Sequence, residues 1–217
     1  PAYFDARELT EAGAAYLAKL DRLTGVRYQR LRRGLWVAAE GLVYEDWDPA
    51  VHLVEALHEG SETWVRWWSV DFGYTIPFVL QCWAEDPDGR LWLYREIYMT
   101  GRLVEDHARQ ILGIVRPEGV WVEPRPRAII CDHDAEDRAT LERHLGLPTF
   151  PAKKERQAGF QAVAARLARG NGGPRIFFLR DSLDKRDPLL EEAKKPCCTE
   201  EEFDGYSGFV RGTAGMS

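Results

Sequence analysis

Residues 63–98, TWVRWWSVDFGYTIPFVLQCWAEDPDGRLWLYREIY, contain three apolar runs of strand length, at 63–72, 76–84 and 91–98. The second and third runs flank Asp86-Pro87-Asp88-Gly89, in which proline and glycine favour the backbone angles of a tight turn. The segment therefore predicts three consecutive strands, with the last two paired as a β-hairpin.

The sequence that follows alternates between helical and strand-like patterns. Helices are predicted at about 103–115, 135–145 and 156–169, and strands at 128–131 and 175–179, with a short strand between the last two helices. Three meandering strands followed by alternating helices and strands imply a mixed sheet with helices on its faces. This is the strand order of ribonuclease-H-like nucleases, so the expected fold class is α/β, with a ribonuclease-H-like mixed sheet flanked by helices.

The segment before these strands has a different character. Apolar residues at helical spacing predict a helix at 9–24, and residues 27–54 are expected to form a connector wrapped on a core. A domain boundary is predicted at 58–62, His-Glu-Gly-Ser-Glu. Because the sequence lacks an initiator Met and begins close to the helical pattern, we expect it to be a piece of a longer polypeptide.

The composition is that of a folded globular protein, with 217 residues, 45% hydrophobic and 29% charged. It excludes disordered, collagen-like and coiled-coil proteins, and a chain of this length buries roughly 70% of its unfolded surface. The four cysteines lack the spacing of a zinc site. No run of about 18 apolar residues and no signal-like start occur, so a soluble protein without a membrane partner is expected.

The net charge of −6 argues against a protein that coats nucleic acid, but the charge is unevenly spread. Residues 22–33 carry five arginines and no acid, and residues 150–180 carry seven basic residues against one acid. Residues 181–206 carry nine acids against four bases. Such asymmetry is typical of a phosphate-facing groove beside an acidic cation site, although solvated helix faces produce similar runs.

Two aspartates follow predicted strands directly. Asp71 ends the first apolar run and Asp132 follows the strand at 128–131, 61 residues later. Ligand sites of such sheets lie at the carboxyl ends of strands, so the two carboxylates meet if the first and fourth strands are neighbours. Asp134 directly precedes a helix with an acidic first turn, where capping is a more frequent role than metal binding.

Paired carboxylates bind Mg²⁺ or Mn²⁺ readily, because hard cations prefer oxygen ligands and relieve the repulsion between like charges. Two such ions activate water and stabilise the leaving oxygen of a phosphodiester. The aspartate pair therefore predicts a metal-dependent phosphodiesterase. The aromatic cluster of Trp64, Trp67, Trp68, Trp83 and Trp92 is interpreted as core, because aromatic residues at strand spacing are more often core than base-stacking platforms.

An ordered set of motifs resembles phage terminase large subunits. Residues 23–30, LTGVRYQR, and 34–44, GLWVAAEGLVY, resemble the segment that leaves the ATPase domain of that family. The later motifs resemble its nuclease domain: Ser69-Val70-Asp71-Phe72-Gly73, Leu93-Tyr94-Arg95-Glu96-Ile97-Tyr98, Cys131-Asp132, and Lys153-Lys154 followed by Ala158-Gly159-Phe160-Gln161-Ala162-Val163. The resemblance covers nearly the whole chain, so it implies a linker and end of the ATPase domain over 1–60 and a ribonuclease-H-like nuclease domain over 61–217.

The resemblance implies a metal-dependent endonuclease that cuts concatemeric double-stranded viral DNA in the host cell cytoplasm and is not part of the mature virion. Its implied partners are DNA, the portal and the small terminase subunit, and its cofactor is Mg²⁺ or Mn²⁺. Asp71 and Asp132 match the first two catalytic acids and metal ligands. Glu96, which matches an acid on the third strand, and Asp134 are further candidate metal ligands. Residues expected to face the DNA backbone are Lys153, Lys154 and Arg156.

Two departures from the family pattern are plain. No Gly-x-x-x-x-Gly-Lys-Ser/Thr phosphate loop occurs, so this piece is not itself the packaging motor. The third acid of the family also has no matching motif, although residues 199–206, TEEEFDGY, resemble the approach to it. The substitutes considered from the sequence are Asp181, Asp184, Asp187 and Asp204, none of them supported by a motif.

Two other functions remain open at this point. One is a junction resolvase or transposase-type nuclease of the same fold class, which branched and linear DNA substrates would distinguish. The other is a catalytically silent module that binds DNA or the motor, which the missing third acid favours.

Overall fold

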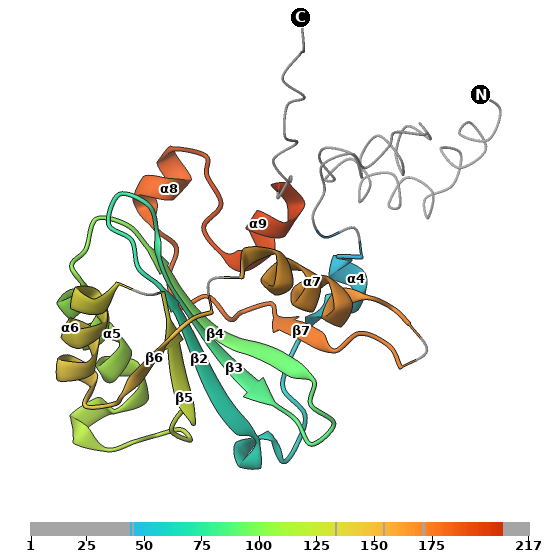
Figure 1. Cartoon of the computed structure of the whole chain (residues 1–217), viewed down its shortest axis with the longest axis horizontal. Helices are drawn as coiled ribbons and strands as arrows, with labels where there is room; N and C mark the ends of the chain where they lie inside the picture. The colour runs from blue at the N-terminus through green and yellow to red at the C-terminus, as the bar shows by residue number, and fades with distance from the viewer. Residues whose placement is uncertain (1–43, 45, 133, 154, 171, 206–217) are drawn as a thin grey trace, which may run out of the picture. The chain divides into compact units, whose positions relative to one another are not determined.

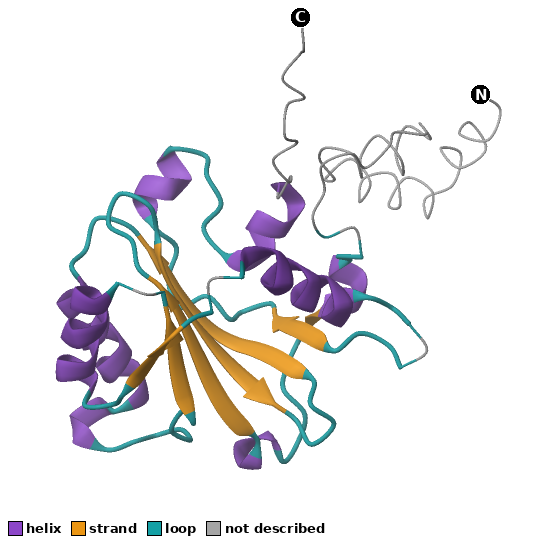
Figure 2. Cartoon of the chain, in the orientation of Figure 1, coloured by secondary structure: helices purple, strands orange, loops and turns teal. Residues whose placement is uncertain are grey.

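The computed structural model describes residues 44, 46–132, 134–153, 155–170 and 172–205. Residues 46–202 form one compact unit built on a seven-stranded sheet, with strand order β1-β7-β4-β3-β2-β5-β6 (Figures 1 and 2). The predicted helix at 9–24 and the connector up to residue 43 lie outside the described residues.

The middle of the sheet is the antiparallel meander expected from the sequence. Its strands are β2 (Val65–Asp71), β3 (Phe78–Glu85) and β4 (Leu91–Met99). In the β3–β4 turn, the N–H of Asp86 donates to the carbonyl of Arg90 at 3.0 Å. Gly89 has a φ of +74°, a left-handed conformation that glycine adopts without steric cost. The predicted hairpin is therefore confirmed.

Four strands extend the sheet in parallel pairings. They are β5 (Ala128–Cys131) beside β2, β6 (Thr149–Pro151) beside β5, β7 (Ile176–Leu179) beside β4, and β1 (Leu53–Val54) beside β7. Strand β1 follows helix α4 (Pro49–His52) and pairs at the edge of the sheet. Residues 46–60, which the sequence assigned to the preceding segment, therefore belong to the compact unit of the sheet.

Helices cover both faces of the sheet (Figure 1). The pair α5 (Val104–Val115) and α6 (Ala135–Leu145) packs on one face, and α7 (Arg156–Leu167) crosses the other. The shorter pieces are η2 (Ser61–Thr63), η3 (Pro117–Gly119), α8 (Pro188–Glu192) and α9 (Thr199–Gly205). The three long helices match the predicted ranges closely. In the described part of the chain, no helix has the length and apolar character needed to cross a membrane.

The main core lies between the sheet and the α5–α6 pair. Successive residues of a strand point to opposite faces, so β2 contributes Trp68 and β5 contributes Ile129 to this core, both almost fully buried. Ile111 packs against them from α5. The ring of His107 stacks on that of Phe78, with centroids 3.9 Å apart, and burial lowers the pKa of His107 to about 4.

The five tryptophans interpreted as core separate into two groups. Trp68 and Trp92 are buried, whereas Trp64, Trp67 and Trp83 are half-buried. The indole N–H of Trp67 donates to a Glu85 carboxylate oxygen at 2.7 Å. The prediction of core residues thus holds fully for two of the five, and the other three lie at the margin of the packed layers.

Replacement of a buried and an exposed apolar residue tests this core. We expect Ile111→Ala to lower the free energy of unfolding by about 2–5 kcal/mol, because it removes buried methyl groups and leaves a cavity. The matched control is Leu103→Ala, whose side chain is 56% exposed and for which we expect a loss below about 1 kcal/mol. Urea unfolding measures both values, and equal losses would contradict the assignment of this core.

Candidate active site

The parallel pairing of β2 with β5 brings Asp71 and Asp132 together at the carboxyl ends of these two strands. Val70 lies opposite Cys131 in this pairing, and the N–H of Asp132 donates to the carbonyl of Val70 at 3.0 Å. Asp71 and Asp132 are the next residues along the two strands. The first and fourth strands of the predicted order are therefore neighbours, which is the condition under which the two carboxylates meet.

A cleft of about 550 Å³ opens beside these strand ends. Its walls come from the β2, β3 and β4 strands, from the end of β5 and from the first turn of α9. The polar residues that line it are Ser69, Asp71, Gln81, Tyr98, Thr199 and Glu202. The cleft therefore joins an aspartate from the sheet to a glutamate that lies 131 residues further along the chain.

Neighbouring carboxylates affect the ionisation of Asp71. Although its side chain remains open to solvent, partial burial raises the pKa of Asp71, and the negative charges of Asp132 and Glu202 raise it further. Like charges have this effect only when they are near one another, because solvent screens distant charges. The site therefore contains three interacting carboxylates, of which two were predicted from the sequence.

A hydrogen bond from Tyr98 of β4 holds the side chain of Glu202 in the cleft. The Tyr98 hydroxyl donates to a carboxylate oxygen of Glu202 at 2.6 Å. Burial, together with this hydrogen bond to a carboxylate, raises the pKa of Tyr98. Sequence reasoning missed Glu202, because only aspartates were considered as the third acid. The sequence carried no signal for Glu202, because the packing of its helix on β3 and β4 depends on contacts with residues more than 100 positions away.

Glu96 lies on the same face of the sheet but beneath the start of α9. Its side chain is buried, and both carboxylate oxygens accept from the N–H of Thr199 at 3.1 Å. The hydroxyl of Thr199 also donates to Glu96. Burial raises the pKa of Glu96 to about 7, and the hydrogen bonds from Thr199 limit the rise. These contacts tie Glu96 to the first turn of α9, and its role as a metal ligand stays a prediction.

Of the four substitute acids considered from the sequence, the three whose side chains are described, Asp181, Asp184 and Asp187, do not line the cleft. Asp187 is buried at the start of α8, where hydrogen bonds from Thr100 and Leu189 outweigh the effect of burial and lower its pKa. Asp184 accepts a hydrogen bond from Gln110 at 2.8 Å, and Asp181 is exposed. The side chain of Asp204 is outside the described part of the structure.

Asp134 caps helix α6. Its side chain accepts hydrogen bonds from the N–H groups of Glu136 and Asp137, both at 3.0 Å. Capping satisfies amide groups that the first turn of a helix leaves without partners. The predicted capping role is therefore confirmed, and the carboxylate oxygen that makes these bonds is directed at the helix.

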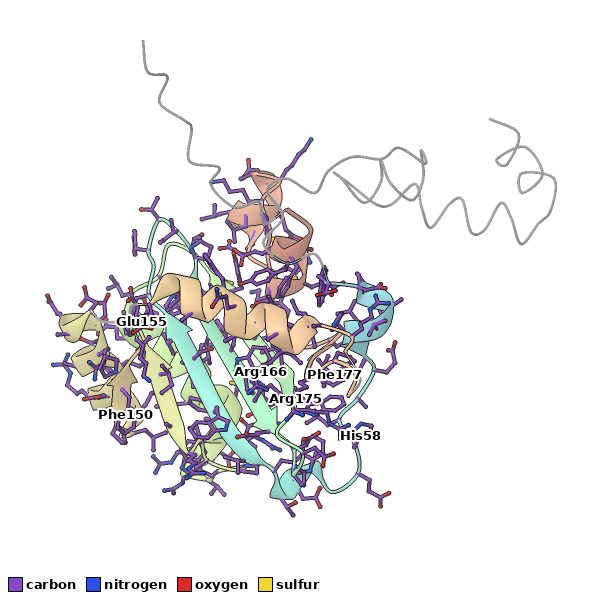
Figure 3. The ribbon with its side chains drawn as sticks, turned by 45° about the vertical axis from the view of Figure 1, so that its right-hand side comes forward. His58, Phe150, Glu155, Arg166, Arg175 and Phe177 are labelled. Carbon is purple, nitrogen blue, oxygen red and sulfur yellow. The ribbon has the colours of Figure 1, made fainter. Side chains whose placement is uncertain are left out.

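Most of the basic residues at 150–180 are used inside the protein. Arg166 and Arg175 donate to backbone carbonyls of the β3–β4 turn at 3.0 and 2.6 Å, and they lie together near the end of α7 (Figure 3). Arg169 and Arg180 form ion pairs with acidic residues close to β1. Four of the seven basic residues in this range thus hold α7 and β7 in place, which accounts for much of the local charge.

Lys153 is the predicted DNA contact that lies beside the cleft. It is exposed and follows Ala152, which lines the cleft and whose N–H donates to the carbonyl of Cys131 at 2.7 Å. Lys154 lies outside the described residues, and Arg156 begins α7. A cation at position 153 therefore stands next to the acidic strand ends.

The donor set of the cleft fits a hard cation. Carboxylate oxygens are the ligands that Mg²⁺ and Mn²⁺ prefer, and a cation would relieve the repulsion that raises the pKa of Asp71. Among the described residues, no three His, Cys, Asp or Glu side chains are gathered closely enough to hold a metal ion. A shared ion would therefore require the carboxylates to move closer together.

Comparison with solved structures shows which fold this is. The large terminase of a thermophilic bacteriophage is 22% identical over 79% of this chain and 41% of that chain, with a TM-score of 0.53. In complex with ADP, the same terminase matches 94% of this chain and 48% of its own at 20% identity, with a TM-score of 0.54. The nuclease domain of the P22 large terminase is 11% identical over 78% of this chain and 95% of that domain, with a TM-score of 0.51.

The chain has the fold of a phage large-terminase nuclease domain. The predicted resemblance and the predicted α/β, ribonuclease-H-like fold class are thereby confirmed. The chain spans less than half the length of the large terminase from the thermophilic bacteriophage. No protein-family model and no curated protein sequence matches it.

The buried carboxyl group of Glu96 predicts a pH dependence of stability. Its pKa is about 7 in the folded protein against an ordinary value of 4.5, so the folded state holds its proton more tightly than the unfolded state. Its contribution to stability is therefore full below about pH 4.5 and is lost as the pH rises through about 7. We expect this loss to be about 2–3 kcal/mol in wild type and to vanish in Glu96→Gln.

Urea unfolding at several values between pH 4.5 and 8 measures this dependence. The matched control is Glu62→Gln, which removes an exposed carboxylate and should retain the wild-type slope. A Glu96→Gln protein with the same slope as wild type would contradict the burial of an ionisable group at this position.

Proposed function

We propose that this chain supplies the endonuclease activity of a viral DNA-packaging terminase large subunit, and that it cuts concatemeric double-stranded DNA with Mg²⁺ or Mn²⁺. One observation carries the proposal: the pairing of β2 with β5 places Asp71 and Asp132 side by side, and Glu202 lines the same cleft as Asp71, in a fold shared with the P22 nuclease domain. By the same reasoning, the partners are DNA, the portal and the small terminase subunit. The place of action is the host cell cytoplasm, outside the mature virion.

Each residue has a distinct task in this proposal. Asp71 and Asp132 hold the cation from rigid strand ends, and Glu202 closes the site from α9. A bound divalent cation supplies an activated water and neutralises charge on the phosphodiester. Lys153 binds the DNA backbone next to the carboxylates, which otherwise repel phosphate. Lys154 and Arg156 follow it along the chain and are proposed to extend the same contact.

Removal of single carboxylates tests the nuclease chemistry. We expect Asp71→Asn and Asp132→Asn each to lower the rate of plasmid cleavage in Mn²⁺ by about 100-fold or more, because a metal ligand is lost. Glu202→Gln should lower the rate as well. The control Asp181→Asn removes an exposed acid outside the cleft and should leave the rate unchanged. Cleavage that survives Asp71→Asn would refute the proposed metal site.

Replacement of Lys153 tests the DNA contact. We expect Lys153→Ala to weaken binding to linear duplex DNA and to reduce the slope of log affinity against log salt by about 1, because one phosphate contact is lost. The control is Arg175→Ala, since Arg175 is committed to a carbonyl of the β3–β4 turn. If the two variants showed the same salt slope as wild type, Lys153 would not contact phosphate.

A catalytically silent module is the second candidate function. It is favoured by the absence, among residues 46–132, 134–153, 155–170 and 172–205, of three ligand side chains within reach of one ion. Calorimetric titration with Mn²⁺ separates the two candidates. Binding that is lost in Asp71→Asn favours the nuclease, whereas DNA binding without uptake of metal favours the module.

A further inference from the structure

We propose that Glu96, Thr199 and Gln81 are positioning residues that hold the first turn of α9 on the sheet and thereby set Glu202 against Asp71. The inference rests on the proposed function, because it explains how the third carboxylate reaches the site. It concerns residues that are not proposed as metal ligands but contact the helix that carries one of them. Their contribution is to fix the helix from which Glu202 projects.

The register of the sheet shows why α9 must lie where it does. Ser69, Gln81 and Glu96 are direct partners across β2, β3 and β4. Asp71, Val79 and Tyr98 form the next row on the same face, two residues further toward the site. The two rows are about 7 Å apart, since a strand rises about 3.4 Å per residue.

The first turn of α9 spans these two rows. Thr199 bonds to residues of the inner row, and Glu202 bonds to Tyr98 of the outer row. Residues three apart share one face of a helix and lie about 4.5 Å apart along its axis, and the length of the Glu202 side chain covers the remaining distance to the outer row. Fixing Thr199 on the inner row therefore fixes Glu202 over the outer row, which contains Asp71.

The bonds that fix Thr199 form a continuous chain with a single direction. The Trp83 indole N–H donates to the Ser69 hydroxyl at 3.4 Å, and that hydroxyl donates to the Gln81 side-chain oxygen at 3.1 Å. The Gln81 amide N–H donates to the Thr199 hydroxyl at 2.7 Å, which donates in turn to Glu96. The indole N–H of Trp83 can only donate, so that end of the chain is chemically fixed, and Glu96 accepts at the other end.

The burial of Glu96 makes the arrangement difficult to disrupt. Its side chain is 1% exposed, and no Lys or Arg of the described residues forms an ion pair with it. Neutral donors from Thr199 are therefore what stabilise a buried carboxylate. If α9 moved away, Glu96 would lose these donors, and a buried polar group without partners is costly. The position of α9 on the sheet thus depends on the hydrogen bonds that Thr199 donates to Glu96.

Substitutions at Thr199 test the inference with little change of shape. Thr199→Val removes the hydroxyl and keeps the branched side chain, whereas Thr199→Ser keeps the hydroxyl and should behave as wild type. Thr140→Val is the matched control, because the hydroxyl of Thr140 only accepts an exposed bond from Arg143 on α6. Glu96→Gln is a further variant, since its amide is a poorer acceptor for the two donors of Thr199. All variants are made in the 217-residue chain.

Hydrogen exchange measured by mass spectrometry reports the docking of α9 directly. We expect Thr199→Val and Glu96→Gln to speed exchange in peptides covering 197–205 by about 5- to 10-fold, which corresponds to the loss of one net hydrogen bond. Peptides of β2 and β5 should be unchanged, as should all peptides of Thr140→Val. Unchanged exchange in 197–205 for both variants would overturn the inference.

Calorimetric titration with Mn²⁺ tests the link from Thr199 to Glu202. We expect Thr199→Val to weaken Mn²⁺ binding by about 5- to 10-fold in wild type and by less than about twofold in a Glu202→Gln background. A full-sized effect in both backgrounds would show that Thr199 does not act through Glu202, which overturns the inference. If the wild-type chain took up no Mn²⁺, the proposed function would fail, and the exchange experiment would still decide the docking of α9.

Discussion

The register between β2 and β5 is the constraint on which the site depends. In parallel pairing, Val70 lies opposite Cys131, so the residues that follow them lie side by side at the carboxyl ends of the two strands. The register is held by the core, because Cys131 and Ile129 face the α5–α6 layer and are almost fully buried. A slip of one residue would turn these side chains to the opposite face and separate Asp71 from Asp132. Hydrophobic packing on one face of the sheet thus aligns the carboxylates of Asp71 and Asp132 at the ends of their strands.

The third carboxylate depends on a different interaction. Glu202 comes from a short helix that contributes little to the main core, and its place is determined by hydrogen bonds to β3 and β4. Directional bonds of this kind define the position of a helix more narrowly than apolar contact does. The combination places two carboxylates at the ends of strands and a third on a short helix held by hydrogen bonds.

The sequence predicted those features that depend on local pattern. The β3–β4 hairpin follows from Asp86-Pro87-Asp88-Gly89, and the positions of Asp71 and Asp132 follow from apolar runs that end in an acid. Capping by Asp134 follows from the acidic turn after it. In each case a few adjacent residues carry enough physical information to define the structure around them.

Features that depend on long-range contact were missed or misread. Glu202 was overlooked because nothing near it in sequence indicates that α9 rests on β3 and β4. The burial of Glu96 under Thr199 was missed because the strand pattern does not show which helix packs above it. The basic run at 150–180 looked like a phosphate groove, whereas Arg166 and Arg175 bond to the β3–β4 turn. Charge alone does not reveal which cations already have partners inside the fold.

A crystal structure of the chain soaked with Mn²⁺ tests the central claim most directly, since the anomalous signal locates the ion independently of the protein atoms. The account predicts a peak between Asp71 and Asp132 with both carboxylates in direct contact, and the side chain of Glu202 turned toward it from α9. A peak elsewhere, or an ion between the aspartates with the side chain of Glu202 directed away from it, would contradict a site built from three carboxylates.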